Sequence, residues 1–290
     1  MGNILLTLSD STRWEGFTDR PDIDMEGEVV FTTANTGYPQ AISDPSFHGQ
    51  ILVFAFPPIG IYGIDPDNLE GSRPWVSGVI IHQRERTPLK EVTQLEEWLN
   101  EWAVPLIYQM DCRNLVLHLR EKGTLMGRLS EHGAAPQLAC LPPSLIRDVS
   151  VTQVEYIGEK GKKVGIFDCG TKRNIIRELL QRNCRIVIFP HDTPADRILE
   201  EKLEGLILSN GPGNPADLEM ETATIRALLG QIPLFGICLG TQLLAQACGG
   251  RTEKLPYGHR GANQPVLHLP TGKGYVTSQN HGYAIVEGSL

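Results

Sequence analysis

The second half of the chain alternates short apolar runs with amphipathic segments. Each apolar run is short enough for a strand, and each amphipathic segment has apolar residues at helical spacing. Such alternation is typical of an open, mainly parallel α/β sheet that helices cover on both faces. Ligands of such sheets bind beyond the carboxyl ends of the strands. The predicted strands are 163–168, 185–190, 205–209 and 233–237, and the predicted helices are 174–183, 196–202, 220–229 and the segment from Leu239 to Gly249.

The first half has a different pattern, with short β-branched and aromatic runs separated by turn residues. Strands are predicted within 27–33, 50–56 and 76–82, and amphipathic spacing predicts helices over 88–102 and 111–121. The segment 136–161 contains Pro142-Pro143 and a glycine-rich stretch, so we interpret it as a connection. We therefore expect a mixed α+β domain over residues 1–150 and an α/β domain over residues 151–290.

One cysteine lies at a predicted strand-to-helix corner. Cys238 follows the run 233–237 and begins the next helix, where unpaired amides and the helix dipole favour a thiolate. Gly236 and Gly240 flank it, as small residues flank a nucleophile on a strained elbow. The alternative is an inert core cysteine. The two glycines and the corner position favour a nucleophile.

A second motif follows the predicted strand 205–209. Asn210-Gly211-Pro212-Gly213 is a rigid turn whose amides can face a ligand and stabilise an oxyanion. A plain tight turn is the alternative. Because this turn and Cys238 end neighbouring segments of the same sheet edge, a functional role is an equally good interpretation.

Composition narrows the function classes. The 290 residues carry a net charge of −8 without a basic stripe, which argues against nucleic-acid binding. The six cysteines are scattered and lack zinc-ligand spacing, so we expect no metal site and a reducing, cytoplasmic location. No signal peptide, membrane span, dinucleotide loop or phosphate loop is evident in the sequence. If ATP is used, we expect another chain to bind it.

Several motifs together resemble those of the class I, triad-type glutamine amidotransferases. The elbow 236–242 and the turn 209–215 are shared by several such enzymes. Segments of the first half are similar only to the small, glutamine-hydrolysing chain of carbamoyl-phosphate synthase. These segments are 35–39, 43–46, 59–63 and 119–123, and the segments 261–265 and 277–284 match as well.

The resemblance implies an activity and a site. Cys238 attacks the side-chain amide of L-glutamine and forms a thioester, while amides near Gly211 and Leu239 hold the oxyanion. Ammonia then passes to a large, ATP- and Mg²⁺-dependent synthetase chain, with which the small chain forms a heterodimer, for carbamoyl phosphate synthesis in the arginine and pyrimidine pathways. The residues that the resemblance assigns to glutamine binding are Ser46, Gly211, Gly213, Leu239, Gln242, Asn280, Gly282 and Tyr283.

Some of these residues have simpler interpretations. Ser46 can cap the turn after Asp44-Pro45, Gln242 can be a solvated helix position, and 280–282 can form a turn. His281 is more readily a structural histidine than a base. The joint match supports the assignment more than any single residue does.

The sequence departs from the family pattern in one respect. The family's base is a His-x-Glu pair near the C-terminus, and no such pair follows Tyr283 before Leu290. Three hypotheses follow, in order of preference: an incomplete small chain, a shortened and catalytically silent interaction or regulatory subunit, or a base supplied by another chain. We expect an incomplete sheet to leave an uncovered edge and apolar surface.

Overall fold

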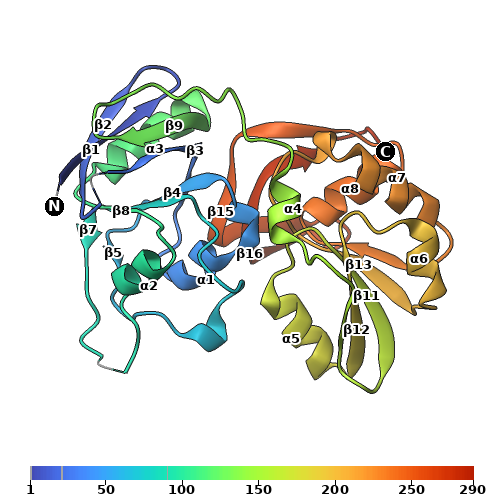
Figure 1. Ribbon diagram of the computed structural model, residues 1–290. Helices are drawn as coiled ribbons and strands as arrows, with labels where there is room; N and C mark the ends of the chain where they lie inside the picture. The colour runs from blue at the N-terminus through green and yellow to red at the C-terminus, as the bar shows by residue number, and fades with distance from the viewer. Residues whose placement is uncertain (1, 21, 90) are drawn as a thin grey trace. The chain divides into compact units, whose positions relative to one another are not determined.

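The computed structural model describes residues 2–20, 22–89 and 91–290 (Figure 1). The chain divides into two compact units, each formed from two segments. Unit 1 comprises residues 1–141 and 255–282, and unit 2 comprises residues 142–254 and 283–290. The predicted contiguous second domain therefore differs from the observed grouping, because residues 255–282 pack with the N-terminal elements.

Unit 1 contains a mixed seven-stranded sheet in the order β2-β1-β9-β3-β4-β6-β8. The pairs β3/β4, β4/β6 and β6/β8 are parallel, whereas β1/β2, β1/β9 and β3/β9 are antiparallel. This is the mixed α+β architecture that the short β-type runs predicted. The strands are β1 (Gly2–Leu8), β2 (Arg13–Thr18), β3 (Asp24–Thr32), β4 (Gln50–Phe54), β6 (Gly78–Ile80), β8 (Leu106–Ile107) and β9 (Leu125–Ser130), and a separate pair consists of β5 (Pro58–Ile59) and β7 (Gln83–Arg84).

Alternation along the central strands gives this sheet an apolar core on each face. Val30 and Leu52 belong to one core, while the adjacent Val29 and Ile51 belong to the other. Helices α1 and α2 cover the first core and α3 covers the second. The bounds are α1 (Tyr38–Ser43), α2 (Leu95–Glu101) and α3 (Cys112–Lys122), with single 3₁₀ turns η1 (Pro45–Phe47) and η2 (Pro66–Asn68).

The helix predicted over 111–121 is confirmed, and the helix predicted over 88–102 is too long. The Asp111 side chain accepts from Asn114 N and caps α3, which ends at Gly123 with φ 93°. In contrast, α2 begins only at Leu95. The preceding segment is held as a loop, since both ends of the Gln94 amide bond to the backbone of Thr87 at 3.1 Å. Lys90 lies outside the described residues.

Unit 2 contains a five-stranded sheet in the order β10-β12-β11-β13-β14. The pairs β11/β12, β11/β13 and β13/β14 are parallel, as the alternating pattern predicted, and only β10 is antiparallel. β10 was missed because it lies within the predicted connection. The elements are β10 (Glu155–Ile157), β11 (Lys162–Asp168), β12 (Cys184–Pro190), β13 (Gly205–Leu208), β14 (Leu234–Gly236), α4 (Leu145–Val149), α5 (Arg173–Gln181), α6 (Ala195–Glu200), α7 (Glu219–Leu228) and α8 (Leu239–Ala247), with the 3₁₀ turn η3 (Pro215–Asp217).

Helices cover both faces of this sheet. Phe167 and Val187 contribute to a core with α7 and α8, whereas their neighbours Ile166 and Ile186 pack against α5. The predicted α/β layering of the second half is therefore confirmed. β14 is the last strand of the sheet, and Phe235 on it is 64% exposed. An apolar side chain is thus exposed on an edge strand of this sheet.

A long hairpin connects the two units along the chain. It consists of β15 (Thr252–His268) and β16 (Lys273–Ile285), which form a separate two-stranded sheet. Within unit 1 the hairpin packs against N-terminal elements, with the Tyr257 ring 6.0 Å from that of Phe31 and Thr124 N donating to Pro256 O at 2.7 Å. These contacts explain why residues 255–282 group with the first half. Among the described residues, none of the helices is long and apolar enough to cross a membrane.

Candidate amidotransferase site

Cys238 occupies a strained corner between β14 and α8. Its backbone has φ 53° and ψ −111°, a conformation that side-chain-bearing residues rarely adopt. Such strain persists where the surroundings impose it and is concentrated at functional sites. The thiol residue is partly exposed and stands at the N-terminus of α8. The strand-turn-helix geometry predicted for the elbow is confirmed.

The two flanking glycines are required by backbone packing. A Cβ on Gly240 would lie 2.1 Å from Leu208 O, and one on Gly236 would lie 2.5 Å from Thr241 N. Both distances are far below van der Waals contact, so no side chain fits at either position. Gly240 N donates to Ser209 O at 2.9 Å, which holds the start of α8 against the end of β13. The glycines therefore allow the close approach that sets the corner.

Two further cysteines, Cys112 and Cys169, are buried in the cores of the two units. Burial, with a smaller effect of the Asp111 carboxylate, raises the pKa of the Cys112 thiol to about 12. Burial likewise raises the pKa of the Cys169 thiol well above its usual value. Both groups are therefore thiols at neutral pH and cannot serve as thiolate nucleophiles.

Hydrogen bonds of two buried side chains hold the turn after β13 in position. Ser209 and Asn210 are fully buried, and the Asn210 side chain donates to Gly170 O at 2.7 Å and accepts from Lys172 N at 3.1 Å. The Ser209 hydroxyl accepts from Cys169 N at 2.8 Å. These bonds tie the turn to the loop that follows β11. A rigid turn suits the preorganised oxyanion donors that the sequence suggested.

The structure brings several of the predicted site residues of unit 2 together. A Cβ on Gly211 would lie 2.9 Å from the Leu239 side chain and 2.1 Å from Cys169 O, so the turn packs directly on the start of α8. Gly213 follows with φ 94°. The two proposed oxyanion segments, near Gly211 and Leu239, are therefore neighbours.

Gln242 is a buried residue rather than a solvated helix position. It is 7% exposed, and its Nε2 donates to Tyr283 O at 2.7 Å. The solvated interpretation of this residue is therefore wrong. The bond joins α8 to the end of β16, so that two predicted glutamine-binding residues of unit 2 are in direct contact.

A second group of predicted residues is assembled in unit 1 around Asp44, which is 1% exposed. Its Oδ1 accepts from Ser46 N and its Oδ2 accepts from Asn280 Nδ2, each at 2.9 Å. Asp44 itself caps η1, so Ser46 is not the capping residue. Asn280 and Gly282 lie within β16, and the interpretation of 280–282 as a turn is wrong. Sequence reasoning missed the role of Asp44, although it precedes Pro45-Ser46 directly.

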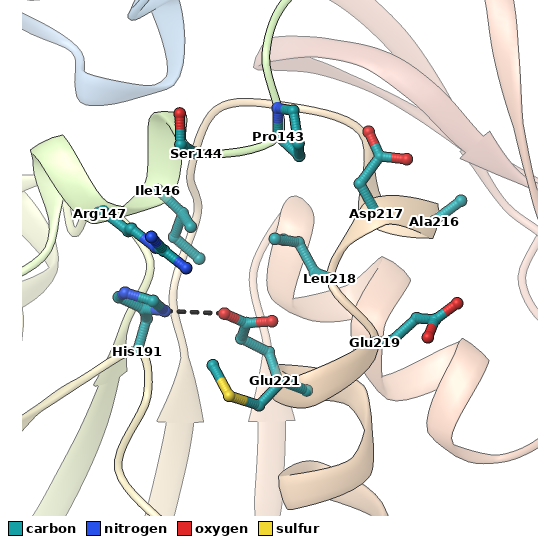
Figure 2. Close-up of a pocket in the computed structure, with 11 residues that line it drawn as sticks. Pro143, Ser144, Ile146, Arg147, His191, Ala216, Asp217, Leu218, Glu219 and Glu221 are labelled. Carbon is teal, nitrogen blue, oxygen red and sulfur yellow. Dashed lines mark hydrogen bonds and ion pairs between the residues drawn. The ribbon is translucent and has the colours of Figure 1, made fainter.

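A separate cavity of about 670 Å³ lies at the carboxyl end of β12 (Figure 2). It is lined by α4, the η3 turn and the first turn of α7. Inside it, His191 Nδ1 is 2.7 Å from Glu221 Oε1, and both side chains are buried. A carboxylate oriented on an imidazole is the arrangement of a catalytic base, so its distance from Cys238 decides its role.

The sheet order excludes this pair as the base for Cys238. His191 follows β12 and Cys238 follows β14, and β11 and β13 separate these strands. Three strand spacings of about 4.8 Å place the two residues roughly 14 Å apart. Proton transfer needs a separation of about 3 Å. The pair therefore serves the structure, since it fastens α7 to the end of β12.

We expect Glu221→Ala to reduce the free energy of unfolding by about 1–3 kcal/mol, because a buried imidazole N–H loses its acceptor. Urea unfolding followed by circular dichroism measures this loss. Glu219→Ala is the matched control, since Glu219 is an exposed residue of the same helical turn. Equal effects of the two substitutions would contradict a structural role for the buried pair.

Among residues 2–20, 22–89 and 91–290, no group of three or more His, Cys, Asp or Glu side chains could hold a metal ion. The site in unit 2 offers a thiol at a helix N-terminus, a rigid turn of amides and a buried amide side chain. This set of groups fits acyl transfer through a covalent thioester.

Comparison with known proteins identifies the family. Residues 6–129 match the carbamoyl-phosphate synthase small chain CPSase domain, and residues 165–290 match the class I glutamine amidotransferases. The carbamoyl phosphate synthase small chain of Fusobacterium nucleatum is 38% identical over 100% of this chain and 84% of its own length. The chain belongs to the carbamoyl phosphate synthase small-chain family.

Other members of this family are equally similar. The small chain of Oceanobacillus iheyensis is 40% identical over 98% of this chain and 80% of its own length. The pyrimidine-specific small chain of Halalkalibacterium halodurans is 41% identical over 98% of this chain and 81% of its own length. The solved structure of a glutamine amido transferase from Methylobacillus flagellatus aligns with 44% of this chain and 57% of its own, at 23% identity and a TM-score of 0.33, too loosely to support an argument.

Proposed function

We propose that this chain is the glutamine-hydrolysing subunit of a carbamoyl phosphate synthase. The strained Cys238 corner carries the proposal, because its geometry exposes a thiol at a helix N-terminus beside a rigid turn. Family membership supports the same activity.

In the proposed reaction, Cys238 Sγ attacks the side-chain carbonyl carbon of L-glutamine. The carbonyl oxygen becomes an oxyanion, which amides near Gly211 and Leu239 stabilise. Collapse of this intermediate breaks the C–N bond, the proton that the thiol lost is delivered to the leaving nitrogen, and ammonia departs to leave a glutamyl thioester. Water then hydrolyses the thioester to glutamate and restores the thiol. Each turnover thus converts glutamine and water to glutamate and ammonia.

The remaining site residues are proposed to bind substrate. Gln242 and Tyr283 contact each other in unit 2, while Ser46 and Asn280 share Asp44 in unit 1. We propose, from the resemblance, a glutamine-binding role for each of these residues and for Gly282. Gly213 extends the turn that begins at Gly211.

The ammonia is proposed to pass to a large synthetase chain that binds ATP and Mg²⁺. The present chain carries no phosphate-binding loop in its sequence, which supports assigning the nucleotide to that partner. The carbamoyl phosphate formed there is proposed to serve arginine and pyrimidine synthesis. A catalytically silent subunit that only docks on the large chain is the alternative.

An electrophilic glutamine analogue tests the proposal. We expect an analogue with a chloromethyl ketone in place of the side-chain amide to alkylate Cys238, and excess glutamine to slow the reaction at least about tenfold. Mass spectrometry of the peptides measures the adduct. The exposed Cys140 and Cys248 provide internal controls that glutamine does not protect. Labelling of Cys238 that glutamine leaves unchanged would contradict the proposed site and favour the silent subunit.

A further inference from the structure

Two histidines meet across the β15–β16 hairpin, in the part of it that belongs to unit 1. His259 Nδ1 lies 3.3 Å from His281 Nε2, and the two rings are in edge-on contact with centroids 5.1 Å apart. The His281 Nε2 atom also lies 3.0 Å from Gln279 Oε1. Two imidazole nitrogens and one amide oxygen thus gather at one place on the hairpin, where His281 donates a hydrogen bond to Gln279.

The backbone holds these donors firmly. Gly258 has φ 67°, and a Cβ there would lie 2.4 Å from His281 O, so the two strands are in close contact beside the imidazoles. Arg260, two residues after Gly258 on β15, is buried and donates through Nη1 to Tyr257 O at 2.6 Å. Because side chains alternate along a strand, anchoring Arg260 inward directs His259 outward. His259 is accordingly exposed and open to a ligand from solvent.

The spacing of the two nitrogens also matches the separation of two ligands on one metal ion. A separation of 3.3 Å is at the long end for a hydrogen bond. Two nitrogens bound to tetrahedral Zn²⁺ at about 2.0–2.1 Å are about 3.3 Å apart. Gln279 Oε1, at 3.0 Å from His281 Nε2, can supply a third ligand. A water molecule would complete four-coordination.

We propose that His259, His281 and Gln279 form a binding site for a divalent transition-metal ion of the Zn²⁺ class. Neutral imidazole nitrogens favour Zn²⁺, Ni²⁺ and Cu²⁺, whereas Mg²⁺ and Ca²⁺ prefer sets of oxygen ligands. The site therefore discriminates against the Mg²⁺ that an ATP-using partner requires. The bound ion would link His259 on β15 to Gln279 and His281 on β16, the two residues that flank Asn280.

Isothermal titration of the metal-free protein with ZnCl₂ tests this proposal. We expect His259→Ala and His281→Ala each to weaken one Zn²⁺-binding event at least about tenfold, as loss of a ligand does. His268→Ala is the matched control, because His268 is an exposed histidine of the same hairpin that contacts Thr271 instead. We expect the His268→Ala protein to bind Zn²⁺ as tightly as the unsubstituted protein does. Any Zn²⁺ that the cysteine thiols bind is the same in all of these variants, because none of them changes a cysteine. MgCl₂ should give no binding at this site.

A second variant distinguishes a ligand set from a loss of folding. Gln279→Glu replaces an amide oxygen by a carboxylate oxygen, so we expect it to tighten Zn²⁺ binding at least about tenfold. Zn²⁺ affinity unchanged in both histidine variants, or unaffected by Gln279→Glu, would overturn the proposal. These readouts do not depend on glutamine hydrolysis.

Discussion

Gly240→Ala is expected to reduce the free energy of unfolding by at least about 3 kcal/mol. The added Cβ would lie 2.1 Å from Leu208 O and 2.5 Å from Leu208 C. Both are backbone atoms of β13, so relief requires α8 to move away from the sheet rather than a side chain to rotate. Urea unfolding monitored by circular dichroism measures the change.

Gly205→Ala is the matched control for this experiment. Gly205 begins the same strand β13. A Cβ added there would have Pro233 O as its nearest atom, at 3.5 Å, which is an ordinary van der Waals contact. We therefore expect a change within about 1 kcal/mol. A Gly240→Ala protein as stable as the Gly205→Ala protein would contradict the close approach of α8 to β13.

Cys238→Gly is expected to be more stable than Cys238→Ala by about 1–2 kcal/mol. The backbone at φ 53° and ψ −111° is strained for any residue with a side chain, at about 1–3 kcal/mol, and glycine relieves that strain. Part of the gain is offset, since glycine loses more chain entropy on folding. Thermal and urea unfolding of the two variants measure the difference. The strained backbone at position 238 would thus lower the free energy of unfolding while it holds the thiol at the corner.

Cys248 provides the opposite case for comparison. It lies at the other end of α8 with φ −81° and ψ 0°, an ordinary conformation. There we expect the glycine variant to be less stable than the alanine variant by about 0.5–1 kcal/mol. If glycine were also the less stable residue at 238, the strain attributed to the corner would be absent.

Much of unit 2 could be predicted from the sequence, because its strands and helices alternate and each has a strong local pattern. The Cys238 corner was predicted for the same reason, since its glycines and its thiol are adjacent in sequence. The antiparallel β10 was missed because Glu155–Ile157 is short and follows a proline-rich connection. The long helix predicted from 88 was wrong because Gln94 bonds to Thr87, a contact that helical spacing does not reveal.

Contacts between distant residues were the least predictable part of the site. Asp44 joins Ser46 to Asn280, which is 236 positions further along the chain than Asp44. His191 and Glu221 are 30 positions apart and lie on different elements. No local pattern connects such pairs, because only the folded backbone brings them together. The roles of the predicted glutamine-binding residues rest on resemblance and stay predictions.

Glutamate release from glutamine is the direct measure of the proposed hydrolysis. It is measured for this chain, alone and with the large synthetase chain, beside the Cys238→Ala variant. We expect release in the complex that falls at least about 10³-fold on removal of the thiol, since a covalent nucleophile is lost. Release that is equal in the Cys238→Ala protein, or absent from both complexes, would contradict the proposed hydrolysis.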